Sequence, residues 1–308
     1  MYFHSSKKSI DMKIIPIFIL AFSLFQISCQ SKSESGKKQP ISELGKQSKN
    51  KALGKLFIIG GGKKSDALIS KLITLSKLEQ ENFMIILPMA SEEPDSAVYY
   101  TAKQFISLGV RPEKIKSFNL NPKNQTKGKI DSLKTASLIY ITGGDQNLFM
   151  KSVLNTSAYD AISTAYQNGT TIAGTSAGAA VMSQKMISGN ELKHPKYTGD
   201  FRTIEAQNFE IKTGLGLLPN AIVDQHFIRR MRMNRLLAVA LENPDQIAIG
   251  IDESTAIIVD GDSATVCGDS QVILIQNSAK KSIHTKNGLL GGKNVKLEIL
   301  LPGEKFKI

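Results

Sequence analysis

The stretch Gly174-Thr175-Ser176-Ala177-Gly178, entered from the apolar run at 170–173, is the most informative part of this sequence. It predicts a β-strand that ends abruptly, a tight turn that presents one serine, and a helix that begins at Ala177. The flanking glycines let neighbouring backbone approach closely, so a strained turn can hold the Ser176 hydroxyl out at the carboxyl edge of a sheet. The backbone N–H of Ala177 would point into the same space and would stabilise a negatively charged oxygen there. A Gly/Ala-rich turn packed tightly for steric reasons has the same pattern, so the pentapeptide alone leaves a nucleophilic serine and a structural turn both open.

Apolar runs of strand length alternate with longer amphipathic segments from Lys55 onward. The predicted strands are residues 56–59, 83–88, 115–120, 137–141 and the run that ends at Ser176. Continuous apolar strands separated by helices indicate a mostly parallel sheet flanked by helices, and therefore an α/β fold. Ligands of such sheets bind beyond the carboxyl ends of the strands, where Gly60-Gly61-Gly62, Gly143-Gly144 and Ser176 all fall. No full dinucleotide fingerprint follows the three glycines, so they indicate close backbone approach and not cofactor binding.

The pattern changes after Asp224. A helix rich in arginine and methionine is predicted for residues 228–242, and short strands follow it. They are predicted at 247–251, 256–259, 265–267 and 272–275, with a hairpin signal at Asp260-Gly261-Asp262 and further strand within 289–308. We find no internal repeat and no linker, so residues 55–308 are predicted to form one catalytic domain with extra C-terminal β-strands. The polar segment 185–216 has no clear period and is a candidate flap over the site.

The first 55 residues differ from the rest of the chain. Met12-Lys13 opens a basic start, residues 14–27 are almost wholly apolar, and Ser28-Cys29 follows. Such a run is short for a membrane span and is typical of an export signal. Its end resembles a bacterial lipobox, although Gln26 stands where an aliphatic residue is usual. We therefore predict a signal peptide over residues 1–29, lipidation of Cys29, and a flexible lysine- and serine-rich tether over residues 30–54.

This N-terminal pattern predicts where the protein resides. We expect an exported, membrane-anchored lipoprotein of the cell envelope, on its periplasmic or extracellular face, whose membrane contact is made only through the lipidated N-terminus. Simple secretion and an uncleaved anchor are the alternatives.

Composition narrows the partners. The chain has 308 residues, of which 41% are hydrophobic, and this suffices for a substantial core. Residues 1–55 contain ten lysines and three acids, so they carry +7 of the formal net charge of +12. The mild excess that remains, without interleaved arginine and aromatic residues, does not indicate nucleic-acid binding. The two cysteines and four histidines show no metal-ligand spacing, so we predict neither metal nor cofactor, and Cys267 is expected to be a small buried residue.

A nucleophilic serine needs a base to take its proton and a carboxylate to orient that base. His226 ends the predicted strand 221–226, and Glu253 follows the strand 247–251, so both are expected at a carboxyl edge. Each has a plain structural explanation as well, because a lone histidine is usually a core or surface residue and an acid after a strand is usually a solvated turn residue. The chain order of α/β-hydrolases offers a second assignment, an esterase that uses Ser176, Asp260 and His284.

Four motifs together resemble the cyanophycinase family, relatives of the aspartyl dipeptidases called peptidase E. The motifs are Thr142-Gly143-Gly144-Asp145-Gln146, the stretch 174–179, Asp224-Gln225-His226-Phe227 with its trailing arginines, and the stretch 250–256. They occur in the family's order, and the resemblance covers roughly residue 55 to the C-terminus. It implies a class I glutamine amidotransferase-like or flavodoxin-like sheet and is compatible with a homodimer.

The resemblance also implies roles for individual residues. Ser176 would be the nucleophile, His226 the general base and Glu253 its orienting acid, while Ala177 and Gly143 or Gly144 would supply the oxyanion hole. The implied substrate-binding residues are Gln146, Asp224, Gln225, Arg230, Arg232 and Arg235. Guanidinium groups bind carboxylates in a bidentate manner, as an aspartyl-rich substrate requires. The predicted helix would place Arg232 and Arg235 on one face; without the motif they would be an ordinary basic surface.

The implied activity is that of a serine exopeptidase that hydrolyses cyanophycin (multi-L-arginyl-poly-L-aspartate) to β-Asp-Arg dipeptides. Cyanophycin is an intracellular reserve, whereas this chain carries an export signal. An exported aspartyl or isoaspartyl dipeptidase of the same family, acting on peptides rich in Asp and Arg, is therefore an alternative. A non-catalytic, peptide-binding envelope lipoprotein is another, although the intact Ser176, His226 and Glu253 argue against a decayed site.

Overall fold

A computed structural model of the chain describes residues 52–78, 82–196, 203–277 and 283–308. They belong to one compact unit, Asn50–Ile308. The predicted signal peptide, Cys29 and nearly all of the tether lie outside the described residues. Within the described ranges, no helix is both long enough and apolar enough to span a membrane.

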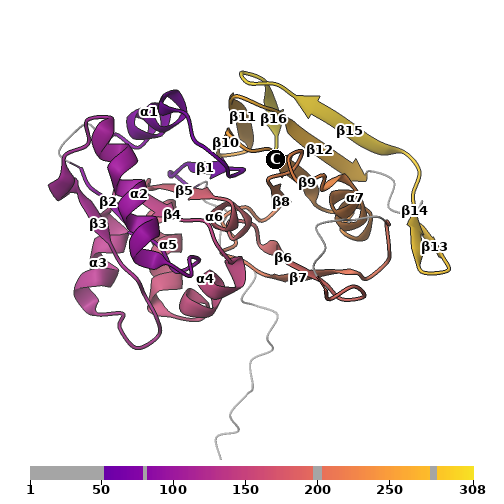
Figure 1. Cartoon of the computed structure of the whole chain (residues 1–308), viewed down its shortest axis with the longest axis horizontal. Coiled ribbons are helices and arrows are strands. Elements are labelled where there is room, and N and C mark those ends of the chain that lie inside the picture. Colours follow the sequence, from indigo (N-terminus) through magenta and orange to yellow (C-terminus); the bar gives the residue numbers. More distant parts are fainter. Residues whose placement is uncertain (1–51, 79–81, 197–202, 278–282) are drawn as a thin grey trace, which may run out of the picture. The chain divides into compact units, whose positions relative to one another are not determined.

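An eight-stranded sheet has the order β16-β11-β10-β1-β5-β4-β2-β3 and combines five strands from the first half of the unit with three from its C-terminal part (Figure 1). Five of its strands are parallel: β1 Leu56–Ile59, β2 Met84–Leu87, β3 Ile115–Ser117, β4 Leu138–Ile141 and β5 Thr171–Thr175. Three antiparallel strands extend the sheet beyond β1: β10 Thr255–Asp260, β11 Ser263–Gly268 and β16 Lys305–Lys307. The predicted α/β fold with a mostly parallel sheet and extra C-terminal strands is confirmed.

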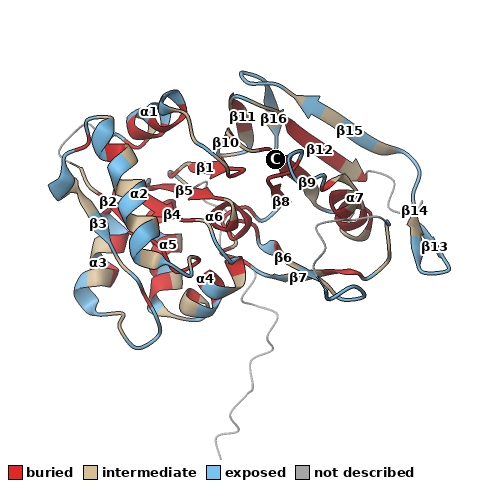
Figure 2. Ribbon diagram, in the orientation of Figure 1, coloured by how far each residue is buried: buried red, intermediate tan, exposed pale blue. Residues whose placement is uncertain are grey.

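Helices cover both faces of this sheet, and its parallel strands β1, β2, β4 and β5 are fully buried, whereas the edge strand β3 is partly exposed (Figure 2). Side chains alternate between the faces of a strand. Phe57 and Ile59 pack in the core that includes α1 Asp66–Leu75 and α2 Pro94–Ser107. Leu56 and Ile58 pack in the core that includes four further helices. These are α3 Lys127–Thr135, α4 Gln146–Val153, α5 Ser157–Gln167 and α6 Ala177–Ala180. Burial on both faces is the reason why the strands read as uninterrupted apolar runs.

A second, four-stranded sheet has the order β15-β12-β9-β8. Its strands are β8 Ala221–Gln225, β9 Ile247–Ile251, β12 Val272–Asn277 and β15 Val295–Leu300, and only β8 and β9 are parallel to each other. Helix α7, Met233–Glu242, packs on it through Leu236 and Ala240. The sequence pattern led us to expect the end of β8 at the carboxyl edge of the same sheet as Ser176. It belongs to the second sheet, yet its end still meets the first, because the N–H of His226 donates to the carbonyl of Gly60 at 2.7 Å.

Two antiparallel hairpins and the short 3-10 helix Pro112–Lys114 complete the described elements. Segment 185–216, which had no clear period, contains β6 Lys185–Glu191 and β7 Phe209–Thr213. The second hairpin consists of β13 His284–Lys286 and β14 Leu289–Gly291. The strand predicted within 289–308 is therefore present as β14, β15 and β16.

The helix predicted for residues 228–242 begins five residues late, at Met233. Residues 228–232 form turns instead, and Met231 has a φ of 50°, which a right-handed helix does not allow. Asp252 holds this turn, because its carboxylate accepts the N–H groups of both Ile228 and Arg229. The sequence had suggested that the arginines lie on one helix, but Arg230 and Arg232 precede its first residue, Met233.

Candidate active site

The turn at Ser176 has the geometry that its flanking glycines predict. Ser176 lies between β5 and α6 with φ 54° and ψ −115°, a strained conformation for a residue with a Cβ. A Cβ at Gly174 would collide with the carbonyl oxygen of Gly178, and one at Gly178 with that of Ile141. Close backbone packing thus forces the chain to turn sharply, and it leaves the serine side chain at the end of the central strands.

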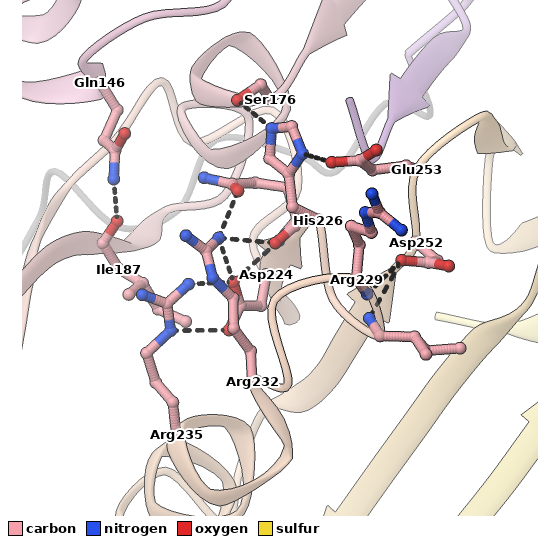
Figure 3. Close-up of polar contacts among 12 residues, drawn as sticks. Gln146, Ser176, Ile187, Asp224, His226, Arg229, Arg232, Arg235, Asp252 and Glu253 are labelled. Carbon is pink, nitrogen blue, oxygen red and sulfur yellow. Dashed lines mark hydrogen bonds and ion pairs between the residues drawn. The ribbon is translucent and has the colours of Figure 1, made fainter. Parts of the chain in front are cut away.

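Ser176, His226 and Glu253 form a continuous hydrogen-bonded chain (Figure 3). Nδ1 of His226 lies 2.6 Å from Oε1 of Glu253, and Nε2 lies 2.8 Å from Oγ of Ser176. An ionised carboxylate can only accept, so Nδ1 carries the proton that donates to Glu253. In the neutral ring, Nε2 is then the acceptor for the serine hydroxyl. This is the arrangement in which a histidine can remove a proton from a serine.

Three different connections supply these side chains. Ser176 follows β5 of the eight-stranded sheet, and His226 follows β8 of the four-stranded sheet. Glu253 lies in the short link between β9 and β10, where the chain passes from the second sheet back to the first. The three residues therefore converge where the two sheets meet.

The glycines at 60–62 are part of this arrangement. A Cβ on Gly61 would lie 2.5 Å from Nε2 of His226, and one on Gly62 would lie 2.7 Å from Cβ of Glu253. The carbonyls of Gly60 and Gly61 also accept the N–H groups of His226 and Ser254. The interpretation of these glycines as a close backbone approach is confirmed, but their contact with the imidazole and the carboxylate was not foreseen.

The glycines at 143 and 144 lie on the other side of the serine. A Cβ on Gly143 would lie 3.3 Å from Cβ of Ser176. Gly144 has a φ of 135° and abuts the backbone of Ala90, so no other residue fits there without strain. Ala177 is buried at the first position of α6. The turn at 143–144 is thus close to the serine, as an oxyanion hole requires, and this role remains a prediction.

Burial and charge set the protonation of His226. Burial lowers its pKa, the hydrogen bond to Glu253 opposes this, and the positive charges of Arg230 and Arg232 lower the pKa further. The net effect of these contributions is that the pKa of His226 lies below its ordinary value of 6.5. The imidazole is therefore neutral at neutral pH, which is the form that acts as a base.

Behind the histidine, four predicted substrate-binding residues bond to one another (Figure 3). Asp224 is 1% exposed, and its Oδ2 accepts from Nε of Arg235 at 2.8 Å while its Oδ1 accepts from Nη2 of the same guanidinium. Nη1 of Arg232 donates to the carbonyl and to Oε1 of Gln225, at 2.6 and 2.5 Å. Arg235 is 2% exposed, so this buried network supports the strand end that carries His226. A direct contact of these four residues with substrate remains a prediction.

The two other predicted pocket residues occupy different surroundings. Gln146 is buried, and its amide donates to the carbonyls of Ile187 and Ser188, which ties α4 to the hairpin strand β6. Arg230 is exposed in the turn after His226 and is close enough to affect the imidazole electrostatically. Of the three arginines in the pattern, it is the exposed one.

Sequence reasoning missed Asp252 as a separate functional residue. Its Oδ1 accepts the N–H groups of Ile228 and Arg229 at 3.0 and 2.9 Å, and its Oδ2 accepts from Oγ of Ser270 at 2.8 Å. It thereby holds the turn directly after His226, which itself has a strained φ of 49°. The sequence did contain a signal for this role, because Asp252 is an acidic residue directly before the candidate Glu253.

The esterase assignment is wrong. Asp260 forms an ion pair with Lys55 at 3.0 Å, at the opposite end of β10 from Glu253. His284 lies in the β13–β14 hairpin, and the imidazole on Ser176 is that of His226. Cys267 is buried, as predicted. Among the described residues, no group of His, Cys, Asp and Glu side chains could hold a metal ion.

Comparison with known proteins identifies the family of the chain. The model of peptidase family S51 matches residues 56–267. A cyanophycinase from Trichormus variabilis (strain ATCC 29413 / PCC 7937) is 32% identical over 236 residues, which cover 73% of this chain and 75% of that protein. A peptidase E from Actinobacillus pleuropneumoniae serotype 5b (strain L20) is 27% identical over 164 residues, or 51% and 64% of the two chains. The crystal structure of a peptidase from an acI-B1 Actinobacterium has a TM-score of 0.61 and 23% identity, and covers 83% of this chain and 97% of that one; it supports the fold. The chain therefore belongs to peptidase family S51 and is a serine-type peptidase.

Proposed function

We propose that this protein is an exopeptidase that hydrolyses cyanophycin to β-Asp-Arg dipeptides, with Ser176 as nucleophile, His226 as general base and Glu253 as the acid that orients the base. The observation that carries the proposal is the position of His226, which is hydrogen-bonded to both Ser176 and Glu253. The similarity to cyanophycinases over nearly three quarters of the chain supports the choice of substrate.

The contacts suggest the order of proton movements. Nε2 of His226 takes the proton from Oγ of Ser176 while the oxygen attacks the scissile carbonyl carbon. Glu253 stabilises the imidazolium that forms, and the N–H groups at Ala177 and at Gly143 or Gly144 hold the oxyanion. The imidazolium then protonates the leaving amine, and the acyl-enzyme remains. Water enters, His226 takes its proton, and hydrolysis of the ester restores Ser176.

Arg230 is the arginine that we assign to direct substrate contact, because its side chain is exposed beside His226. A guanidinium there would bind a carboxylate of the substrate in a bidentate manner. Arg232 and Arg235 would act from behind, since their bonds to Gln225 and Asp224 hold the end of β8. Gln146 would position the turn at 143–144 relative to the hairpin strand β6.

Incubation with cyanophycin, followed by mass spectrometry of the soluble products, tests this function. We expect β-Asp-Arg from the wild-type protein and a loss of at least about 10⁴-fold in turnover with Ser176→Ala. A fluorophosphonate probe should label the wild type and not Ser176→Ala. The variant His284→Ala is the matched control and should keep full activity, because His284 lies outside the hydrogen-bonded chain.

Similarity to peptidase E favours a second candidate, an aspartyl or isoaspartyl dipeptidase. Cleavage of short aspartyl dipeptides without release of dipeptides from cyanophycin would select this candidate. The probe experiment separates both candidates from a non-catalytic peptide-binding lipoprotein, which would leave the serine unlabelled. The contacts of His226 and the family membership argue against that third reading.

We also propose that the protein is exported and anchored by a lipid on Cys29, with the segment up to residue 54 as its tether, and that its peptide substrate is its partner at the envelope. The apolar run at 14–27 and the following Ser28-Cys29 support this. Labelled palmitate should be incorporated by the wild type and not by Cys29→Ser, whereas Cys267→Ser should label normally. Sedimentation of the chain from residue 50 onward would test the homodimer.

A further inference from the structure

One carboxylate of the β6–β7 hairpin is held by hydrogen bonds on one oxygen and open on the other. Oε2 of Glu210 accepts from Oγ of Ser188 at 2.6 Å, from Nδ2 of Asn190 at 2.9 Å and from Nζ of Lys212 at 3.0 Å. Oε1 is bonded to no described residue, and the side chain is 26% exposed. The hydrogen bond from Ser188 lowers the pKa of Glu210, and Lys212 and Asn190 act in the same direction, whereas burial opposes them. The hairpin therefore presents an ionised carboxylate with one oxygen open to a further donor.

Glu210 faces the helix α4. Side chains alternate along β7, so Glu210 and Lys212 share one face of the strand, whereas Ile211 packs in a different core on the other face. Lys212 is paired in register with Met186, which packs in the same core as Met150 of α4. The side chain of Glu210 is therefore on the side of the hairpin that lies against α4 (Figure 1).

The hairpin is tied to the first turn of α4, close to Ser176. The amide of Gln146 donates to the carbonyl of Ser188 at 2.7 Å, and Figure 3 shows this amide directed at the hairpin. The turn that precedes α4 contains Gly143, where a Cβ would lie 3.3 Å from Cβ of Ser176. Oγ of Ser188 in turn donates to Glu210. One backbone turn, one side chain and two hydrogen bonds thus connect the candidate nucleophile with the open carboxylate.

The proposed substrate needs a carboxylate of this kind. Every aspartate of cyanophycin carries an arginine, so a guanidinium must be accommodated near the serine. Arg230, which is exposed in the turn after His226, is itself positive and cannot bind it. Asp145 uses one oxygen to cap α4. Three other carboxylates near the imidazole are already bonded within the protein: Asp224, Asp252 and Glu253. An ionised carboxylate is the partner that a guanidinium binds most strongly in proteins, and Glu210 offers one.

We propose that Glu210 determines specificity for arginine-bearing substrates, because its Oε1 accepts hydrogen bonds from the guanidinium of the substrate. The proposal rests on the proposed function, since it names the residue that recognises the arginine of the same polymer. Lys212 has two effects, because it holds Oε2 in place and competes with the substrate cation for the same carboxylate. The site then matches both charges of a β-Asp-Arg unit, with Glu210 for the guanidinium and Arg230 for a carboxylate.

Binding without turnover tests the proposal. The probes are a fluorescein-labelled β-Asp-Arg oligomer and the same oligomer with citrulline in place of arginine, titrated by anisotropy against the Ser176→Ala protein at low salt. Citrulline has nearly the shape of arginine but no charge, so we expect its Kd to be at least about tenfold higher. Glu210→Gln in this background should raise Kd of the arginine oligomer at least about tenfold and leave that of the citrulline oligomer unchanged. Lys212→Met should lower Kd of the arginine oligomer, because it removes the competing cation.

Glu205→Gln is the matched control. Glu205 lies on the connection between β6 and β7, but its carboxylate is paired with His194 at 2.7 Å, so both oligomers should bind as they do to the parent. In Glu210→Gln, the amide oxygen can still accept from Ser188 and Asn190, so the variant is expected to fold, and thermal melts would verify this. The comparison of arginine with citrulline needs no change at Glu210 and tests the proposal independently of that variant.

Three results would overturn the assignment. The first is equal affinity of the Ser176→Ala protein for the two oligomers, or no binding of either. The second is a Glu210→Gln variant that keeps its affinity for the arginine oligomer or loses affinity for both oligomers equally. The third is an arginine preference that disappears with Asp145→Asn and persists with Glu210→Gln, which would move the contact to the cap of α4. A wild type that binds as expected but releases no β-Asp-Arg from cyanophycin would count against the proposed function alone, since the binding assay involves no turnover.

Discussion

Gly61 lies so close to His226 that a methyl group on its Cα would come within 2.5 Å of Nε2, the imidazole nitrogen that faces Ser176. The φ of Gly61 is +109°, which L-amino acids rarely adopt. The backbone at this glycine therefore sets the position of the imidazole by direct contact, in addition to the hydrogen bond from the N–H of His226 to the carbonyl of Gly60.

Gly61→Ala should displace the imidazole and lower kcat by about 100-fold, because shifts of about 1 Å in a catalytic group have effects of this size. Steady-state kinetics on a peptide substrate provide the measurement. Gly109→Ala is the matched control, since Gly109 also has a positive φ (+93°) but has nothing within 4 Å of its would-be Cβ. It shares the backbone strain and leaves the site untouched. Equal activity in the two variants would contradict the contact argument.

The ion pair between Asp224 and Arg235 should contribute strongly to stability. Arg235→Leu leaves a buried carboxylate without its bidentate partner, and the free energy of unfolding should fall by about 3–5 kcal/mol. Urea denaturation monitored by circular dichroism measures it. Lys55→Ala, which breaks the exposed pair with Asp260, should cost less than about 1 kcal/mol. Similar losses for the two variants would show that the Asp224 pair is not effectively buried.

Asp252 should act as a positioning residue for His226. Asp252→Ala removes the acceptor of the N–H groups of Ile228 and Arg229, so kcat should fall about 10- to 100-fold with a smaller change in KM. Asp252→Asn should recover much of the rate, because an amide oxygen can accept the same two hydrogen bonds. The exposed Asp269 provides the control variant Asp269→Ala. If Asp252→Asn is as slow as Asp252→Ala, the carboxylate has another role.

The lowered pKa of His226 sets the pH dependence of activity. The rate of inactivation by a fluorophosphonate should fall at low pH with an apparent pKa below 6.5, since the base must be neutral. Arg230→Ala should move this limb to higher pH, because the positive charge of Arg230 lowers the pKa. Glu253→Gln should move it to lower pH, because the hydrogen bond and charge of Glu253 raise the pKa, and should also slow the reaction by up to about 10⁴-fold. Shifts in the same direction would refute this electrostatic account.

The same shift links His226 to stability. Between its lowered folded pKa and 6.5, the unfolded chain binds the proton and the folded chain does not. Stability therefore rises with pH through that window, is fully present above 6.5, and is lost as the pH falls through the folded pKa. Urea titrations on either side of the window should show this slope in the wild type and its absence in His226→Gln.

Several parts of the fold could be predicted because their signals are local. The four inner parallel strands, β1, β2, β4 and β5, are buried on both faces, so they appear as continuous apolar runs such as residues 56–59 and 138–141. The strand–turn–helix at Ser176 is encoded by Gly174 and Gly178, whose missing side chains allow the close packing. Prediction failed at residues 228–232, where a helical pattern gave way to turns. The reason is Asp252, more than twenty residues away in sequence, which bonds to the backbone there.

The sequence contained the reactive side chains in an order typical of a serine peptidase family, but it did not show their surroundings. Only the structure shows that Arg232 and Arg235 are buried and donate hydrogen bonds to Gln225 and Asp224. The division of the strands into two sheets was not visible either, because pairing partners such as β8 and β9 are separated by a helix.

The short-range pattern around residue 176 was sufficient for a serine held at the end of a strand, since that geometry depends on neighbouring glycines alone. The resemblance of four motifs to one family assigned His226, and not His284, as its partner, but only the folded chain shows His226 in contact with Ser176. Hydrogen bonds of 2.6 and 2.8 Å require three distant connections, from two different sheets, to meet at one point, and no local pattern specifies such a meeting.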